Sequence, residues 1–446
     1  MLAMAKYKET IAAIATPPGS GGVGIIRISG TASREIAISI LGYQPTPRTA
    51  TFSSFKTADK KIIDQGLALF FPGPDSFTGE DVLELQGHGG SIIMNRLLKR
   101  VIESGARQAN PGEFSERSFL NGKMDLVQAE AVADLINSAS EQAAKSAMRS
   151  LSGEFSDQIE LLKEKIISMR MLIEAHLDFT EEELNIPFFT FNQQIDEAID
   201  QTQLILNKAR QGAILNEGLR LAIVGAPNVG KSSLLNRLLQ QGRAIVTDIP
   251  GTTRDTLTEK FLIEGIPFII TDTAGLRKTS DPVEQEGINR TNQTIEDADL
   301  VLVMSEYPET TKNLPEKREN CLFIINKIDR DPDIIPEIKK TGGKTEIQLS
   351  VKTGAGLDLL KKELLKTASV DSGAEGVFTA RQRHIEALKK NRECLEQAQS
   401  CLSCSKHVDL AAEYLRLALH SLGEITGEFT TEDLLGEIFS GFCVGK

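Results

Sequence analysis

Short apolar runs alternate with longer amphipathic runs over residues 1–122. The strand-like runs are IAAIAT, VGIIRIS, GLALFF and DVLELQG, and the helix-like runs are SREIAISIL and SIIMNRLLKRVIES. Gly and Pro separate them in segments such as PPGSGG, PGPDSFTG and NPGEF, which predicts compact turns between the elements. The pattern therefore predicts a mixed α/β domain over residues 1–122.

The pattern becomes helical at Lys123. An apolar repeat of helical period begins near Leu126 and continues through AAKSAMRSL. Two longer helical stretches follow, FSDQIELLKEKIISMRMLIEAHLDF and FNQQIDEAIDQTQLILNKARQG, and an Asn-Ile-Pro sequence between them breaks the helix. Residues 123–215 are therefore predicted to be helical.

A second α/β pattern runs from Leu219 to about Lys366, and helical segments return after the Ser/Gly stretch SVDSGAEG. Helices thus flank this α/β unit on both sides. Because domain termini commonly lie close together, we predict one helical domain formed by residues 123–215 and 374–446, with an α/β domain of residues 216–373 inserted into it. The predicted fold class is multi-domain, α+β and α/β.

Composition narrows the range of partners. The chain has 446 residues, a formal net charge of −12 and no Trp. Such an acidic chain is poorly suited to gripping phosphate backbones over a wide face, so any nucleic-acid contact must be local or made largely by a partner. No apolar run reaches the length of a membrane span. The odd number of cysteines, five, favours a reducing compartment, and we predict a cytoplasmic protein without membrane association.

The sequence LRLAIVGAPNVGKSSLLNRLL carries a phosphate-binding loop between a strand pattern and a helix pattern. It fits G-x-x-x-x-G-K-[ST] with Gly225, Gly230, Lys231 and Ser232. Backbone N–H groups of such a loop cradle phosphates, helped by the N-terminus of the following helix. Lys231 is predicted to neutralise the β- and γ-phosphates, and the Ser232 hydroxyl to ligate Mg²⁺.

Three later motifs identify the base as guanine. DTAG follows the strand-like PFIITD and is predicted to meet Mg²⁺ and the γ-phosphate. NKID follows the buried run CLFII, and its Asp329 can accept hydrogen bonds from a donor pair that guanine offers and adenine does not. SVK, which follows another strand, can contact the guanine oxygen. The residues predicted to contact GTP are Asn228, Val229, Gly230, Lys231, Ser232, Ser233, Thr247, Asp248, Ile249, Pro250, Gly251, Thr252, Thr253, Asp272, Thr273, Ala274, Gly275, Asn326, Lys327, Asp329, Ser350, Val351 and Lys352.

The loop AIVTDIPGTTRDT between the first two motifs is predicted to hold metal ions. Thr253 is the candidate second Mg²⁺ ligand beside Ser232. The carbonyl and hydroxyl oxygens around Thr247, Ile249 and Thr252 are of the kind that coordinate hard cations. Asn228, inside the phosphate loop, offers a further oxygen, and a monovalent cation there could take over the charge of an arginine finger.

Leu276 stands where other GTPases place a Gln that orients the attacking water, and Leu cannot do this. A downstream carboxylate is one replacement, and Glu284 is the candidate. A surface charge on a loop is the alternative role for Glu284.

Long segments outside these motifs carry a family resemblance. ATPPGSGGVGIIRISG, PGPDSFTGEDVLELQGHGG, NPGEFSERSFLNGKMDLVQAEAVADLI and EITGEFTTEDLLGEIFSGFCVGK, together with GAPNVGKSS and DTAGLR, closely resemble the bacterial MnmE (TrmE) family of tRNA-modification GTPases. The resemblance covers essentially the whole chain. It implies a Ras-like G domain inserted into a discontinuous helical domain, and an N-terminal tetrahydrofolate-binding-like domain that also forms a homodimer.

The resemblance also implies the activity and its partners. The family modifies carbon 5 of the wobble uridine, position 34, of certain tRNAs to an aminomethyl or carboxymethylaminomethyl group. It works with the FAD-dependent MnmG (GidA) protein, in a heterotetramer or larger complex. The added carbon is thought to come from 5,10-methylene- or 5-formyl-tetrahydrofolate, and the positions that correspond to folate contacts are Arg27, Glu84, Lys123 and Lys446.

In the G domain the resemblance implies activation by potassium. Asn228, Thr247, Ile249 and Thr252 correspond to the K⁺ ligands, and Glu284 corresponds to the catalytic glutamate that orients water indirectly.

Cys443 lies in the C-terminal FCVGK motif, where a packing role beside the folate pocket is favoured over a nucleophilic one because no nearby His would activate a thiolate. His88 is either a ligand contact or a packed turn residue.

Two other functions compete with this one. A GTP-switched ribosome-assembly factor of the Era or Der type shares the nucleotide motifs. It would need an RNA-binding KH domain or a second G domain, and the sequence shows neither. A folate enzyme with a merely regulatory G domain is the other alternative, and the N-terminal region has no obvious base or metal cluster to support it.

Overall fold

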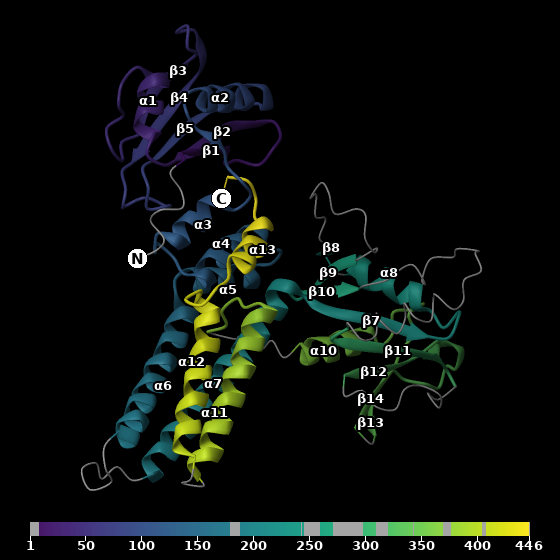
Figure 1. The fold of residues 1–446 in the computed structure, drawn as a ribbon. Coiled ribbons are helices and arrows are strands. Elements are labelled where there is room, and N and C mark those ends of the chain that lie inside the picture. The colour runs from purple at the N-terminus through teal and green to yellow at the C-terminus, as the bar shows by residue number, and fades with distance from the viewer. Residues whose placement is uncertain are drawn as a thin grey trace, which may run out of the picture. The chain divides into compact units, whose positions relative to one another are not determined.

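The computed structural model describes residues 9–178, 188–241, 243–244, 259–270, 298–308, 320–341, 343–368, 376–403 and 407–445 (Figure 1). The chain divides into two compact units. One consists of Met1–Ala133, Ser150–Ile199 and Lys390–Lys446, and the other of Asp134–Arg149 and Asp200–Lys389. Helices α4 (Leu126–Asn137), α5 (Glu141–Leu151), α7 (Phe188–Glu217) and α11 (Gln382–Ser403) continue from one unit into the other.

The N-terminal part of the first unit is a six-stranded sheet covered on one face. Its strand order is β3-β4-β5-β2-β1-β6, with β1 Ile11–Ile14, β2 Gly21–Ser29, β3 Thr51–Lys56, β4 Ile62–Phe71, β5 Val82–Gly89 and β6 Arg107–Gln108. Helices α1 (Ser33–Leu41) and α2 (Ser91–Glu103) pack on this sheet around Ile26, Phe55 and Leu97. The strands alternate between core-facing and outward-facing side chains, as expected for a sheet buried on one face.

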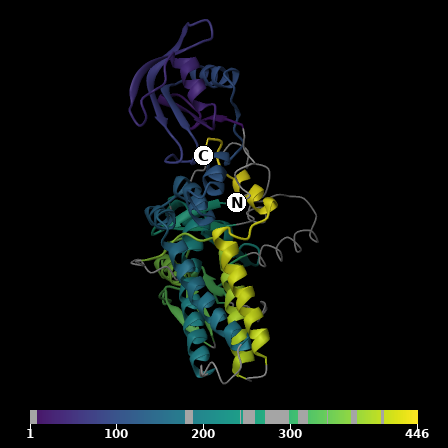
Figure 2. The same cartoon turned by 60° about the vertical axis from the view of Figure 1, so that its left-hand side comes forward.

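The helices of the first unit include a long antiparallel pair. Helices α6 (Glu154–Asp178) and α12 (Val408–Thr426) run side by side (Figures 1 and 2). Buried α6 residues at helical spacing, including Phe155, Ile159 and Leu162, supply the apolar stripe. Helices α3 (Glu113–Leu120) and α13 (Glu432–Ser440) pack together, and Val444 forms a β-bridge with Pro111. The C-terminal segment is thus attached to the N-terminal domain.

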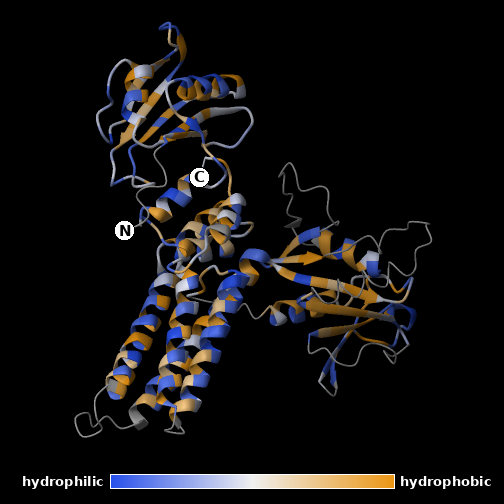
Figure 3. Ribbon diagram, in the orientation of Figure 1, coloured by the Kyte–Doolittle hydropathy of each residue, from blue (hydrophilic) through white to orange (hydrophobic). Residues whose placement is uncertain are grey.

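The second unit contains an eight-stranded sheet of order β13-β14-β12-β11-β7-β10-β9-β8. Strands β10, β7, β11, β12 and β14 are parallel to one another, whereas β8, β9 and β13 pair antiparallel at the two edges. The bounds are β7 Leu219–Gly225, β8 Arg243–Ala244, β9 Glu259–Ile263, β10 Ile266–Ile270, β11 Leu300–Glu306, β12 Cys321–Asn326, β13 Ile338–Thr341 and β14 Lys344–Gln348. The central strands are predominantly apolar (Figure 3), as expected for parallel strands covered on both faces.

Three further elements follow the strands of this sheet: α8 (Lys231–Gln241), the short 3-10 helix η2 (Ile328–Arg330) and α10 (Leu357–Thr367). Each begins just beyond the carboxyl end of a parallel strand. In open α/β sheets this is the edge at which ligands bind. The predicted strand-loop-helix context of the phosphate loop is therefore present.

Candidate functional site

The phosphate loop joins β7 to α8 and is shaped by two unusual backbone conformations. Asn228 has a φ of 65°, and Gly230 a φ of 108°. A Cβ on Gly230 would lie 2.4 Å from Nδ2 of Asn326, so only glycine allows the loop to approach this neighbour. The Lys231 ammonium donates to the carbonyl oxygens of Gly225 and Ala226 at 2.7 and 2.9 Å, and burial lowers its pKa. The loop thus folds around its own lysine.

Asn326, at the end of β12, connects the phosphate loop to the loop that carries Ser350 and Val351. Its side chain is 3% exposed. Its Nδ2 donates to the carbonyl oxygen of Val229 at 2.7 Å, and its Oδ1 accepts from the backbone N–H of Val351 at 3.0 Å. One buried amide therefore fixes the spacing between two predicted nucleotide-binding loops, a role that the motif alone does not reveal.

Asp329 is positioned by the same second loop. The hydroxyl of Ser350 donates to its Oδ1 at 2.6 Å, and this hydrogen bond lowers the pKa of the carboxyl group. Asp329 is exposed and therefore available to a base. The neighbouring Lys327, with a φ of 67°, forms a 2.5 Å ion pair with Glu306 at the end of β11, and Arg330 also contacts Glu306. An ionised acceptor and an anchored lysine suit a site that reads the donor edge of guanine.

Several predicted site residues lie outside the described residues. They are Thr247, Asp248, Ile249, Pro250, Gly251, Thr252, Thr253, Asp272, Thr273, Ala274, Gly275, Leu276, Glu284 and Lys446. Among the described ones, Ser232 and Ser233 are exposed at the start of α8, Ser350 and Val351 are buried, and Lys352 is exposed. The described part of the site therefore contains the phosphate loop and the two base-recognition loops.

The structure brings the predicted residues Arg27 and Glu84 together in the N-terminal domain. They face each other on β2 and β5, and the guanidinium Nε and Nη2 each lie 3.0 Å from Oε1 of Glu84. The guanidinium Nη1 donates to the carbonyl oxygen of Gly445 at 3.3 Å. The rings of Phe77 and Phe114 lie with their centroids 5.5 and 5.9 Å from the guanidinium carbon. The aromatic pair and the Gly445 carbonyl were not predicted.

Lys123 lies beside Gly79, and the segment that ends at Gly445 reaches Arg27. Lys123 is exposed, and its Cγ lies 3.3 Å from the position of a Cβ on Gly79, two residues after Phe77. Gly445 has a φ of 101°, and a Cβ there would lie 2.7 Å from the carbonyl oxygen of Ile14. Only glycine fits this close approach. Because the Gly445 carbonyl accepts a hydrogen bond from Arg27, the residue before Lys446 is held at the site.

Two family models match this chain. The model of the GTP-binding protein TrmE N-terminus matches residues 10–123, and that of the MnmE helical domain matches residues 126–443. The tRNA modification GTPase MnmE of Coxiella burnetii (strain RSA 493 / Nine Mile phase I) is 51% identical over 456 residues, which cover 99% of each chain. The same-named protein of Methylococcus capsulatus (strain ATCC 33009 / NCIMB 11132 / Bath) is 49% identical, covering 98% of this chain and 99% of that one.

The chain belongs to the MnmE family of tRNA modification GTPases. The predicted fold class and the prediction of a GTP hydrolase are both confirmed by this membership. Among solved structures, the G domain of the T. maritima FeoB iron transporter matches 34% of this chain and 98% of its own, with 26% identity and a TM-score of 0.26. A similarity at this score adds nothing to the assignment.

Two further residues considered in this MnmE family member, Cys443 and His88, are exposed. Cys443 is exposed, and its carbonyl oxygen accepts from the N–H of Gly112 at 3.4 Å. His88 is 73% exposed and its Nδ1 lies 2.7 Å from Oδ1 of Asp64, so it is not the packed turn residue offered as one alternative. Within the described parts of the chain, no helix is both long and apolar enough to cross a membrane.

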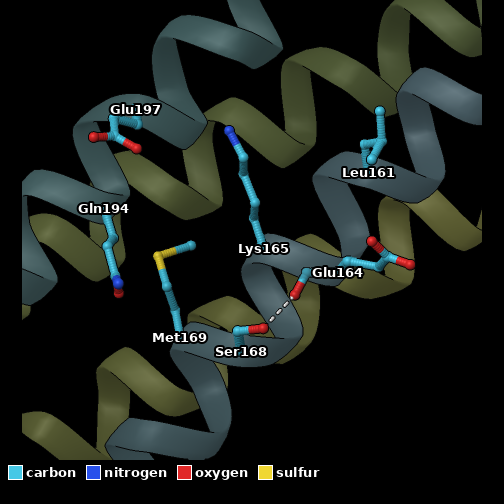
Figure 4. Close-up of a pocket in the computed structure, with 7 residues that line it drawn as sticks. All are labelled: Leu161, Glu164, Lys165, Ser168, Met169, Gln194 and Glu197. Atoms are coloured by element: carbon cyan, nitrogen blue, oxygen red, sulfur yellow. Dashed lines mark hydrogen bonds between the residues drawn. The ribbon is translucent and has the colours of Figure 1, made fainter.

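The helical part of this MnmE family member also contains a pocket of about 390 Å³ between α6 and α7 (Figure 4). Its lining mixes charged, polar and apolar side chains: Leu161, Glu164, Lys165, Ser168, Met169, Gln194 and Glu197. The Ser168 hydroxyl donates to the carbonyl oxygen of Glu164 at 2.8 Å. The pocket contains none of the predicted site residues.

Proposed function

We propose that this protein is a potassium-activated GTP hydrolase that, together with the FAD-dependent MnmG (GidA) protein, modifies carbon 5 of the wobble uridine of certain tRNAs. Membership of the MnmE family supports this function. The observation that carries the nucleotide part is the bridge from Asn326 to Val229 and Val351, because it holds a phosphate-binding loop and a base-binding loop at a fixed distance. The product carries an aminomethyl or carboxymethylaminomethyl group.

The proposed hydrolysis uses two metal ions that differ in role. Ser232 and Thr253 ligate Mg²⁺, and Asn228, Thr247, Ile249 and Thr252 ligate K⁺. When bound, K⁺ supplies a fixed positive charge beside the phosphates, as an arginine finger does in other GTPases. Glu284 orients the attacking water, a role that Leu276 cannot fill. The left-handed conformation of Asn228 supports a specialised role for this residue, because non-glycine residues seldom adopt it.

The proposed carbon donor, 5,10-methylene- or 5-formyl-tetrahydrofolate, binds at Arg27, Glu84, Lys123 and Lys446. Arginine and lysine suit the carboxylates of the folate glutamate tail, and a glutamate suits the donor edge of a pterin. The hydrogen bond between Arg27 and Gly445 supports this assignment, since it ties the segment ending at Lys446 to the N-terminal sheet. The ring of Phe77, which is 37% exposed, adds apolar surface for a flat ligand.

The proposed assembly is a homodimer that joins MnmG in a heterotetramer or larger complex and acts on tRNA in the cytoplasm. The proposed coupling runs from GTP hydrolysis to the folate-binding domain, with hydrolysis serving as a conformational drive. MnmG, rather than this acidic chain, is proposed as the main holder of the tRNA.

The potassium requirement can be tested on the purified protein. We expect GTP hydrolysis to be at least about tenfold faster in potassium than in sodium at equal ionic strength, because Na⁺ does not fill a K⁺ site and a charge at this place is worth several orders of magnitude in kcat. Asn228→Ala is expected to remove most of the difference, whereas Asn236→Ala on α8 serves as the matched control. Equal rates in the two salts would contradict the potassium part of the proposal.

A further inference from the structure

The segment Ile338–Thr367 has a charge opposite to that of the whole chain. It contains seven lysines and three carboxylates, whereas the chain as a whole carries a formal charge of −12. In the structure this segment comprises the antiparallel hairpin β13–β14 and helix α10. Positive charge is therefore gathered on one small part of the second unit.

Two of these lysines lie near a single carboxylate, and a third lies one turn away on the same helix. Lys340, on β13, pairs across the hairpin with Thr345, and its Nζ lies 3.6 Å from Oε1 of Glu363 on α10. Lys366, one turn further along α10, lies close to Lys340, and Lys362 precedes Lys366 by one helical turn. Lys340 is 53% exposed and Glu363 is 12% exposed. All three lysines are exposed, whereas the Glu363 side chain is largely covered.

Like charges held side by side are unfavourable unless an anion approaches them. Contact with Lys340 lowers the pKa of Lys366, and the charge of Lys362 acts in the same direction, whereas Glu363 opposes both. One carboxylate does not balance three ammonium groups. Anionic groups arriving from solvent would relieve this repulsion.

Two further lysines of the hairpin, Lys339 and Lys344, lie on the face of the sheet opposite to Lys340 and α10, because successive residues of a strand point to opposite faces. Lys339 is half exposed and pairs with Glu337 at 2.8 Å, and the Lys344 ammonium lies 5.5 Å from the centroid of the Phe323 ring. Lysines on an edge strand such as β13 also prevent pairing with another sheet. That role does not account for Lys362 and Lys366, which are on a helix.

The elements that carry these lysines are anchored in the core and include one edge of the sheet. Helix α10 is fixed by the buried residues Leu357, Leu360 and Leu364, and β14 by Ile347, which belongs to the same apolar cluster. Strand β13 forms one edge of the sheet and β8 forms the other. An anion bound at β13 and α10 would therefore lie at the edge of the sheet opposite to β8.

We propose that Lys340, Lys362 and Lys366 form a surface that binds the phosphate backbone of tRNA. The proposal rests on the proposed function, in which the protein acts on tRNA. Lysines are flexible point charges that suit sequence-independent phosphate contacts. A small patch of this kind also fits an acidic chain, which can hold RNA only locally.

The test compares three variants of the full-length protein by fluorescence anisotropy with labelled unmodified tRNA over a range of KCl concentrations. The first, Lys340→Gln with Lys362→Gln and Lys366→Gln, removes the three charges. The second replaces the same three residues with Arg. The control triple, Lys145→Gln with Lys389→Gln and Lys390→Gln, removes three exposed lysines elsewhere. GTP hydrolysis without tRNA is measured for each variant as a check on folding.

The Gln triple is expected to bind tRNA about tenfold more weakly near 0.1 M salt, with a salt dependence (the slope of log K against log salt) shallower by about 2, because each lost phosphate contact lowers this slope by about 0.7–0.9. The Arg triple and the control triple should bind as the unchanged protein does, and all should hydrolyse GTP normally.

Unchanged tRNA affinity in the Gln triple would overturn the surface but not the proposed function. The surface would also be overturned if the Gln triple lost binding to a labelled polyglutamate peptide but still bound tRNA. That result would identify an acidic protein as the ligand. Equal loss in the Arg triple would also overturn the surface. Absence of tRNA binding by the unchanged protein would overturn both the surface and direct action on tRNA.

Discussion

In the nucleotide site one buried amide, Asn326, holds two backbone loops together, whereas in the Arg27 site charged side chains and a carbonyl from distant segments hold one another. Asn326 is 3% exposed, but the side chains of Arg27 and Glu84 are 23% and 15% exposed. The partners of Arg27 are 57 and 418 residues away along the chain. The nucleotide site is therefore built from compact motifs, and the Arg27 site from the tertiary fold.

This difference determines how each site should respond to mutation. A buried polar group that loses its partner carries the full cost of desolvation. A partly exposed ion pair is screened by water and is worth less. The nucleotide site should consequently depend sharply on one side chain, and the Arg27 site more gradually on several.

The largest effect is expected from Asn326→Ala. The change leaves the carbonyl of Val229 and the N–H of Val351 without their buried partner, each at about 1–3 kcal/mol, so the affinity for GDP should fall roughly 100-fold. Fluorescent GDP titration measures this directly. Asn236→Ala, on the exposed side of α8, should leave the affinity unchanged. A loss of less than fivefold would show that Asn326 does not organise the loops.

A smaller effect is expected from Arg27→Gln, at the other site. Binding of 5-formyl-tetrahydrofolate, followed by calorimetry, should weaken about tenfold to 100-fold, since hydrogen bonds to charged groups contribute about 1.5–3 kcal/mol. GDP affinity should not change. Arg34→Gln breaks another arginine–carboxylate pair of the same domain, with Asp81 at 2.7 Å, and should leave folate binding intact. Equal weakening by both variants would point to general destabilisation of the domain.

The smallest effect is expected from Ser350→Ala, which should change the pH dependence of GDP binding at the base-recognition loop. The Ser350 hydroxyl lowers the pKa of Asp329, so the carboxylate proposed to accept from guanine persists to lower pH in the unchanged protein. In Ser350→Ala the pKa of Asp329 rises, and GDP binding should be lost at a higher pH as the solution is acidified. At neutral pH the affinity should fall only about two- to fivefold.

Thr353→Ala is the matched control for this change, because it removes a hydroxyl from the same loop that does not contact Asp329. Its acidic limit, the pH at which GDP binding is lost on acidification, should match that of the unchanged protein. If the acidic limit of Ser350→Ala matched it too, Ser350 would have no influence on Asp329.

The sequence allowed more to be predicted at the nucleotide site than at the Arg27 site, for a physical reason. A phosphate loop and a guanine motif use groups at fixed spacings along the chain, so both motifs can be recognised in the sequence. The resemblance supplied Arg27 and Glu84, but the places of Phe77, Phe114 and the carbonyl of Gly445 depend on how segments distant in the sequence meet the sheet. No local pattern encodes that meeting.

The elements of the fold could likewise be predicted where a local sequence pattern specifies them. The continuous apolar run of β12 and the helical repeat of α1 were readable, since period and burial agree there. The polar hairpin β13–β14 was not identified, because its strand IKKT carries no strong alternation and owes its place to pairing with β14. The bridging role of Asn326 was also missed, although its place in the guanine motif was predicted. The predicted domain boundaries and the metal ligands in residues 247–253 stay predictions.

The central claim is that GTP hydrolysis and the Arg27 site serve one modification of the wobble uridine. Nucleoside mass spectrometry of tRNA from a strain lacking this gene, complemented with the unchanged protein, Asn326→Ala or Arg27→Gln, tests it most directly. We expect the unchanged protein to restore the carbon-5 modification and both variants to restore much less of it. Wobble uridines that keep their modification in the deletion strain, or full restoration by both variants, would contradict the claim.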